Sequence, residues 1–185
     1  MRDIKDRTVD HLNQLISATR LRLRRHSPFF SALALYANTE FTTEVSLAAT
    51  DGHKLFFNPS TYCDLEHQER DAVFLHELLH AALLHPMRRG TRDPRIFNIA
   101  ADIVVNGIIA HESPFQLPGN IIRDEELENK SVEEIYEILL KDSKKHNLTF
   151  EDLIDENNRA NHRKGSLQSR DHDNSFKEMT IEELT

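Results

Sequence analysis

The segment that most constrains the fold is residues 72–84, which read AVFLHELLHAALL. All of its side chains are apolar except those of His76, Glu77 and His80. A helix that is apolar on every side is a buried helix. Burying an imidazole or a carboxylate without a partner costs on the order of 2–7 kcal/mol for each group. The segment therefore predicts an interior helix whose three polar side chains have a partner there.

These three side chains form the pattern H-E-x-x-H. His76 and His80 are four residues apart, so on a helix they lie one turn apart on one face, where neutral imidazoles can bind one Zn²⁺ ion. Glu77 flanks that face, and a carboxylate beside a metal-bound water can act as a general base. The alternative is a chance pattern in a chain with 11 histidines, in which these are core histidines bonded to the backbone. We prefer the metal site because a metal offsets the cost of burial.

A second apolar segment, residues 94–110 (PRIFNIAADIVVNGIIA), is expected to be a helix with proline in its first turn. Asn98, Asp102 and Asn106 are each four residues apart and form one polar line on this helix. A carboxylate between two amides in a buried helix needs a partner. The metal that we expect at His76 and His80 still lacks a third protein ligand.

A catalytic zinc ion usually has three protein ligands and an open position for water. We prefer Asp102 as the third ligand, because the 22 residues after His80 allow one loop and an antiparallel return helix. The alternatives are His53, His111 and His85. Of these, His85 follows His80 by five residues, which turns it away from the metal-facing side of the helix.

With Asp102 as a ligand, Asn98, Asn106 and His85 would lie behind the ligands and orient them. Otherwise Asp102 would be a buried carboxylate held by the two amides or by an arginine. The basic loop at residues 87–95 (MRRGTRDPR) could orient a substrate, be an ordinary solvated loop, or pair with the acidic C-terminal third.

The flanking segments predict the rest of an α+β domain. Residues 3–25 are expected to be a helix with a basic C-terminal turn. Residues 44–58 are expected to be a β-hairpin that turns at Asp51-Gly52. Its edge strand could pair with an extended peptide, or the hairpin could be purely structural. Asp64 is expected to cap the helix of the H-E-x-x-H motif, without a capping box.

The C-terminal third is expected to differ from the rest. Ser131 and Glu134 predict a capping box for a helix that ends near Leu140. Residues 120–185 carry 17 acidic and 10 basic side chains, a net charge of −7 out of −8 for the whole chain. We therefore expect a domain at residues 1–141, followed at 142–185 by an acidic, flexible tail that could bind a partner protein.

Charge and composition also exclude several classes of protein. The negative charge argues against a nucleic-acid partner. The single cysteine excludes an internal disulfide and fits a reducing compartment. The N-terminus has no apolar signal segment, and no apolar run is long enough to cross a membrane. We expect a soluble, cytoplasmic protein.

The stretch HELLHAALLHPMRRGTRDPRIFNIAADIVVN, with the earlier ATDGHKLFFNP and the later KSVEEIYEILL, resembles a metallopeptidase domain of bacteria and phages. That domain often precedes a von Willebrand A-like domain, and the resemblance covers about residues 5–141. It implies a zincin-type fold in which His76, His80 and Asp102 bind the metal and Glu77 is the catalytic base. It assigns no role to His85. The chain stops before a von Willebrand A-like domain could fit, so we expect a stand-alone form or a fragment.

The sequence thus predicts a zinc-dependent peptidase that cuts a protein or peptide with a metal-activated water, with Glu77 as the general base. The expected fold is α+β and zincin-like, with a small sheet or hairpin packed on the motif helix and on the helix that carries Asp102. One alternative is a metal-stabilised protein-binding module without turnover. Glu77 argues against it, since a structural site is usually four-coordinate and needs no base. A weaker alternative is a hydrolase directed at nucleic acid.

Overall fold

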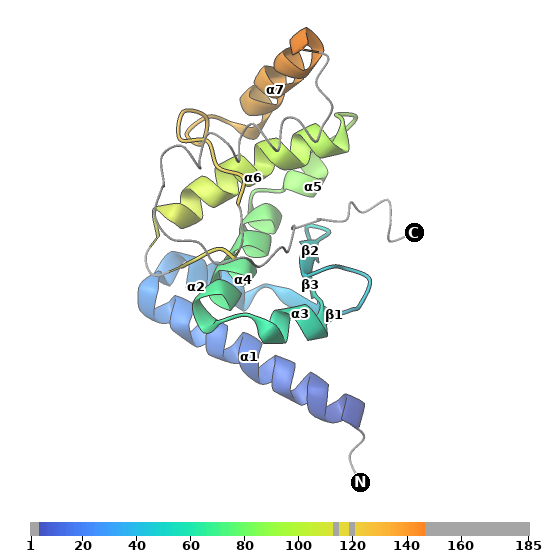
Figure 1. Ribbon diagram of the computed structural model, residues 1–185. Helices are drawn as coiled ribbons and strands as arrows, with labels where there is room; N and C mark the ends of the chain where they lie inside the picture. Colours follow the sequence, from blue (N-terminus) through green and yellow to red (C-terminus); the bar gives the residue numbers. More distant parts are fainter. Residues whose placement is uncertain (1–3, 113–114, 119–120, 147–185) are drawn as a thin grey trace, which may run out of the picture.

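The computed structural model describes residues 4–112, 115–118 and 121–146. Over these residues the protein is mostly helical, with one small three-stranded sheet, which confirms the predicted α+β class (Figure 1). In chain order the elements are α1 (Ile4–His26), α2 (Pro28–Leu35), β1 (Asn38–Phe41), β2 (Ala48–Thr50), β3 (Lys54–Phe57), α3 (Pro59–Asp64), α4 (His67–Ala82), α5 (His85–Arg88), α6 (Pro94–Ala110) and α7 (Val132–His146).

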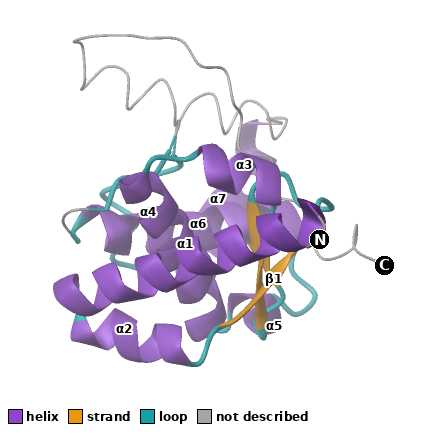
Figure 2. Ribbon diagram, turned by 90° about the horizontal axis from the view of Figure 1, so that it is seen from below, coloured by secondary structure: helices purple, strands orange, loops and turns teal. Residues whose placement is uncertain are grey.

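The helix α4 is the centre of the fold. It contacts α1, α2 and α6 and the strands β2 and β3, and its residues 71–80 are all buried. Figure 2 shows α1 and α2 side by side over one face of the molecule. The largest fully buried side chains include Tyr62, Phe57, Phe74, Phe97, Leu12 and Leu23. The apolar motif segment is therefore the interior helix that the sequence predicts.

The sheet has the strand order β1-β3-β2. Strands β2 and β3 are antiparallel and form the predicted hairpin, in which the Asp51 carboxylate accepts hydrogen bonds from the backbone N–H groups of His53 and Lys54 at 2.7 Å. Gly52 has a φ of +91°, which suits glycine at this turn. Strand β1 pairs parallel with β3. The sequence does not predict β1, because the strand has only four residues and two of them, Asn38 and Glu40, are of types depleted in strands.

The predicted start of α4 is wrong. Asp64 ends the short helix α3, and Glu66 is the N-cap of α4. A capping box is also present, because the Glu69 side chain accepts a hydrogen bond from the Glu66 backbone N–H at 3.0 Å. Asn58 caps α3 and accepts from the Ser60 backbone N–H. The separate helix α3 moves the cap by two residues, and nothing in the apolar periodicity of α4 indicates it.

The later helices agree better with the sequence. Asp93 caps α6 by accepting from two backbone N–H groups. Ser131 and Glu134 form the predicted capping box of α7, but this helix continues past Leu140 to His146. The predicted tail, 142–185, lies mostly outside the described residues, as do positions 113–114 and 119–120. The domain boundary stays a prediction.

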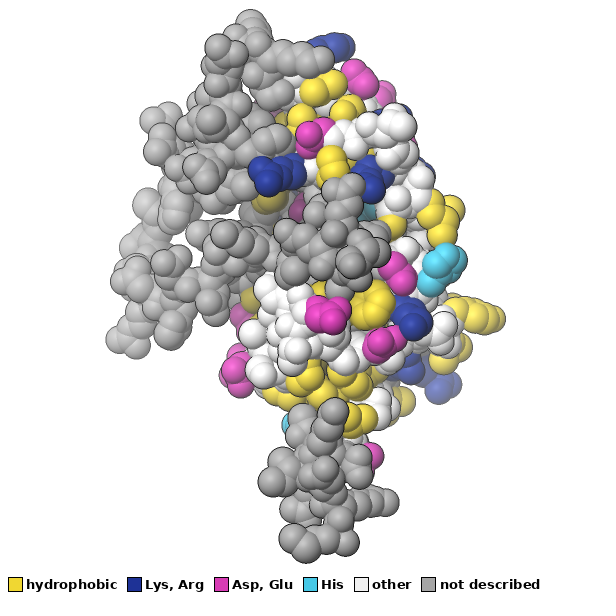
Figure 3. All heavy atoms as spheres, turned by 90° about the vertical axis from the view of Figure 1, so that its right-hand side faces the viewer, with side chains coloured by type: hydrophobic (Ala, Val, Ile, Leu, Met, Phe, Trp, Pro, Cys, Tyr) yellow, Lys and Arg dark blue, Asp and Glu magenta, His cyan; other side chains and the backbone are white. Residues whose placement is uncertain are grey.

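Two surface properties bear on the classes of protein considered above. In the described part of the chain, no helix combines the length and the apolar character needed to span a membrane. On the face drawn in Figure 3, basic and acidic side chains are interspersed and do not form one basic patch.

Candidate metal centre

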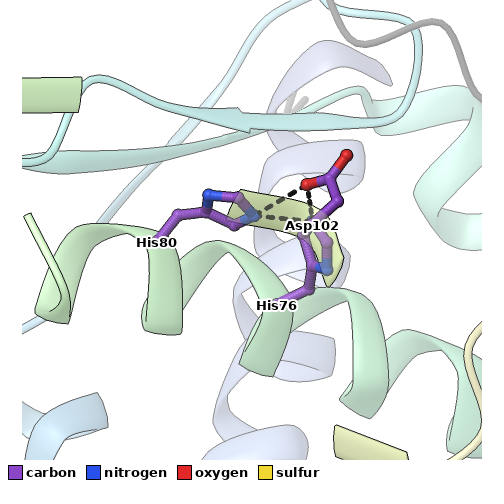
Figure 4. A group of neighbouring side chains, drawn as sticks. All are labelled: His76, His80 and Asp102. Carbon is purple, nitrogen blue, oxygen red and sulfur yellow. Dashed lines mark hydrogen bonds and ion pairs between the residues drawn. The ribbon is translucent and has the colours of Figure 1, made fainter. Parts of the chain in front are cut away.

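The side chains of His76, His80 and Asp102 meet between α4 and α6 (Figure 4). His80 Nε2 lies 3.0 Å from His76 Nε2, and Asp102 Oδ1 lies 3.1 Å from His80 Nε2 and 3.5 Å from His76 Nε2. A tetrahedral zinc ion with bonds of about 2.0–2.1 Å holds its ligand atoms about 3.3 Å apart. The triangle of donor atoms therefore has the size that such an ion needs.

The two helices bring these atoms together as the spacing predicts. His76 and His80 project from one face of α4, a turn apart, and Asp102 lies in the middle of α6, which packs on α4. All three side chains are at most 13% exposed. The donor set is therefore shielded from water, which strengthens its attraction for a cation.

Asp102 is held as a carboxylate. Burial, the largest single effect, raises the pKa of its carboxyl group, but protons on the neighbouring imidazoles, which a bound metal would displace, outweigh burial and lower that pKa to about 2. Its Oδ1 atom is buried and, within the described structure, accepts no hydrogen bond of good geometry. A buried carboxylate oxygen in this state calls for a partner. The residues present fit a metal ion bound by Oδ1 and the two imidazole nitrogens.

Asn106 fixes the orientation of His76. The Asn106 side-chain NH₂ donates to the backbone carbonyl of Ile122 at 2.8 Å, so its Oδ1 must be the atom that lies 3.0 Å from His76 Nδ1. An amide oxygen only accepts, so His76 Nδ1 carries the proton and Nε2 presents its lone pair to the triangle. This is the tautomer that can bind a metal through Nε2.

His85 lies against the other nitrogen of His80. Its Nδ1 is 3.1 Å from His80 Nδ1, and the side chain is almost fully buried. Burial lowers the pKa of His85 to about 3, with smaller contributions from His80 and Arg88. A neutral His85 can accept a hydrogen bond from His80 Nδ1–H, which leaves His80 Nε2 to bind a metal.

The backbone of Leu84 explains how His85 reaches His80. Leu84 has a φ of +58°, in the left-handed region that a leucine rarely adopts. The chain therefore leaves the helical path after α4 and turns back into α5. On a continued helix His85 would point well away from His80. Backbone strain of this kind is common near functional sites.

The remaining residues considered for the site differ in their distance from the triad along the chain and in their exposure. Glu77 is next to His76 in α4 and is 2% exposed. Asn98 is partly buried, one turn before Asp102, and among the described residues it makes no hydrogen bond with the triad. His53 is exposed at the tip of the hairpin. His111 is largely exposed and is paired with Glu128.

The basic loop at residues 87–95 partly serves the fold. Arg88 forms two hydrogen bonds with Glu133 of α7, at 2.6 and 3.0 Å, which joins the loop to the acidic C-terminal third. Arg92 donates to two backbone carbonyls and lies over the rings of Phe97 and Tyr136. For Arg88, pairing with the C-terminal third is therefore the correct alternative.

One part of the site has no counterpart in the sequence analysis. The Ile122 carbonyl, which orients Asn106, belongs to an irregular segment after α6. Every residue has a backbone carbonyl, so the residue type at position 122 does not indicate this contact.

Comparisons with known proteins support a metal-dependent peptidase at the level of the family. No curated protein and no solved structure matches the chain significantly. A family model described as "Putative metallopeptidase domain" matches residues 11–181, which is most of the chain and includes the whole triad. The chain belongs to this metallopeptidase domain family.

Proposed function

We propose that this protein is a zinc-dependent peptidase in which His76, His80 and Asp102 hold the metal. The observation that carries the proposal is the buried triangle of two imidazole nitrogens and an ionised carboxylate oxygen, with edges of 3.0–3.5 Å. Membership of a metallopeptidase family supports the same activity. When bound, zinc supplies a Lewis acid that polarises a carbonyl and lowers the pKa of a water ligand to about 7.

Glu77 is the proposed general base. It takes a proton from the attacking water and then donates that proton to the leaving amine. Its position on α4, directly after His76 and three residues before His80, and its burial away from bulk water support this role. Asn106 and His85 hold the two imidazoles in the tautomers that bind metal. In the part of the chain that the structure describes, Asn98 makes no comparable contact with the triad, and the proposal gives it no role.

The proposed substrate is an extended protein or peptide segment. Strand β2 is an edge of the sheet and contacts α4. A peptide that pairs with the backbone of β2 would lie beside the helix that carries the motif. This arrangement supports main-chain recognition of an extended segment and does not by itself select a side chain.

The substitution Glu77→Gln tests the proposal. The expected result is a protein that keeps about one zinc ion per chain and loses cleavage of a denatured protein, because the amide cannot take a proton. The control is Glu137→Gln, at an exposed position of α7. Zinc is measured by atomic emission and cleavage by the appearance of free amines.

Two outcomes would contradict the proposal. Unchanged cleavage by Glu77→Gln would exclude Glu77 as the base. A wild-type protein that binds zinc but cuts neither denatured proteins nor a peptide library would favour a metal-stabilised binding module instead.

A further inference from the structure

The orientation of the Asn106 side chain decides which tautomer His76 adopts. With Oδ1 toward His76, the imidazole must carry its proton on Nδ1, and Nε2 presents its lone pair to the triangle of donor atoms. If the amide turned over, its NH₂ would face Nδ1, which would then have to accept. The proton would move to Nε2, the atom that faces His80 and Asp102, and a protonated nitrogen cannot bind a metal.

The Ile122 carbonyl is what prevents this turn. It accepts from the Asn106 NH₂ at 2.8 Å, and a reversed amide would place two oxygen atoms against each other there. Asn106 is 4% exposed, so water has little access to replace this contact. The correct tautomer of His76 therefore depends on the position of a backbone group 16 residues beyond Asn106.

A cluster of Glu128, Arg123 and His111, called the clasp below, holds the segment that carries Ile122. The Glu128 carboxylate is 5% exposed and accepts from Arg123 Nε at 2.9 Å. It also lies 2.9 Å from His111 Nε2, just beyond the end of α6. Arg123 follows Ile122 directly, so this clasp ties the carbonyl of Ile122 to the end of α6.

Gly107 lets the clasp sit against α6. A Cβ atom at position 107 would lie 2.6 Å from the Cβ of Glu128, closer than real Cβ atoms approach one another. The clashing atom is next to the backbone of Glu128, so a small rotation of the side chain cannot relieve it. Gly107 directly follows Asn106. Glu128 therefore packs against α6 directly beside Asn106, the residue whose amide the clasp helps to orient.

We propose that residues 121–128 are a positioning element of the metal site: the clasp of Glu128 on Gly107, Arg123 and His111 places the Ile122 carbonyl so that Asn106 selects the metal-binding tautomer of His76. The inference rests on the proposed metal site. It adds a segment that supplies none of the three donor atoms found among the described residues.

The affinity for Zn²⁺ alone tests this inference, measured by competition with a chromophoric chelator. Glu128→Gln keeps the shape of the side chain and weakens its bonds to Arg123 and His111. Gly107→Ala pushes Glu128 away from α6. Each variant is expected to bind Zn²⁺ about 10- to 100-fold more weakly, the usual effect of losing an outer contact of a metal ligand. Glu126→Gln, at an exposed position of the same segment, is the matched control and should bind like the wild type.

Asn106→Ala separates positioning from general damage. Alanine has no amide to orient, so in this variant the position of the Ile122 carbonyl no longer affects the tautomer of His76. In the Asn106→Ala background, Glu128→Gln and Gly107→Ala are therefore expected to cause no further loss of affinity. A merely structural role of the clasp would weaken binding by the same factor in both backgrounds. Circular dichroism confirms that each variant is folded.

The outcomes distinguish the inference from the proposed function. Wild-type protein that binds no Zn²⁺ overturns both. Wild-type protein that binds Zn²⁺, together with unaffected Glu128→Gln and Gly107→Ala variants, overturns only the positioning role. Equal losses in the Asn106 and Asn106→Ala backgrounds also overturn it.

Discussion

The buried imidazole of His85 should make the metal-free protein sensitive to mild acid. Its pKa is about 3 in the folded protein, whereas an unfolded histidine has a pKa of about 6.5. Below pH 6.5 the unfolded chain takes up a proton at this position and the folded chain does not. The free energy of unfolding therefore falls as the pH decreases from about 6.5 toward 3.

The size of the effect follows from these two values. Between pH 7 and pH 5, His85 alone should reduce the free energy of unfolding by about 2 kcal/mol, and the loss should approach about 5 kcal/mol below pH 3. The carboxyl groups of Glu128 and Glu133 also have lowered pKa values, mainly through bonds to Arg123 and Arg88. They contribute little above pH 5, because an unfolded glutamate has a pKa of about 4.3.

Urea unfolding at pH 7, 6 and 5, after removal of metal with a chelator, measures this effect. The wild type should lose about 2 kcal/mol more over this range than His85→Gln, which cannot take up the proton. Histidines that do not contact His85 contribute equally to both proteins and cancel. His53→Gln, at the exposed tip of the hairpin, is the control and should follow the wild type. Parallel curves for the wild type and His85→Gln would refute the argument that His85 is buried and neutral.

Three further predictions concern the metal and the core. Asp102→Asn should weaken Zn²⁺ binding by more than about 100-fold, the upper end of the range for a residue that only contacts a metal ligand. Its circular dichroism spectrum should stay unchanged. Asp71→Ala breaks the pair that Asp71 forms with Arg22 at 2.5 and 2.7 Å. It should cost about 2–3 kcal/mol in urea unfolding, less than for a fully buried pair because Arg22 is 32% exposed. Leu75→Ala, at a fully buried position of α4, should cost about 2–5 kcal/mol. Leu35→Ala, at a position that is 75% exposed, should stay within about 0.5 kcal/mol of the wild type.

The sequence predicts the parts of the site that depend on helical periodicity. The spacing of His76 and His80 places both rings on one face of α4. The polar line on α6 places Asp102 opposite them. These relations survive in the structure because both helices are regular and buried, so a residue's position in the helix determines the direction of its side chain.

The sequence fails where the backbone leaves regular geometry. On a continuous helix, His85 would point away from His80. The left-handed backbone conformation of Leu84 redirects the chain and brings His85 back to His80. The amide of Asn106 can be placed near His76 from its helical position. The group that orients this amide is a main-chain carbonyl, and any residue at position 122 would supply one.

The choice of outer partners bears on whether the metal would be catalytic or structural. Through Nδ1, the ring nitrogen away from the triangle, His76 contacts an amide oxygen and His80 contacts a neutral imidazole. A carboxylate in either place would make the metal-facing nitrogen more basic, and so reduce the pull of the metal on a water ligand.

The triad itself carries one negative charge, that of Asp102, and a divalent zinc ion would leave a net positive charge. Such a charge would help the ion to lower the pKa of a water ligand. A structural zinc site usually has four protein ligands, whereas the described residues bring three metal-ligating side chains together here. The charges and the outer partners therefore favour hydrolysis over a structural role.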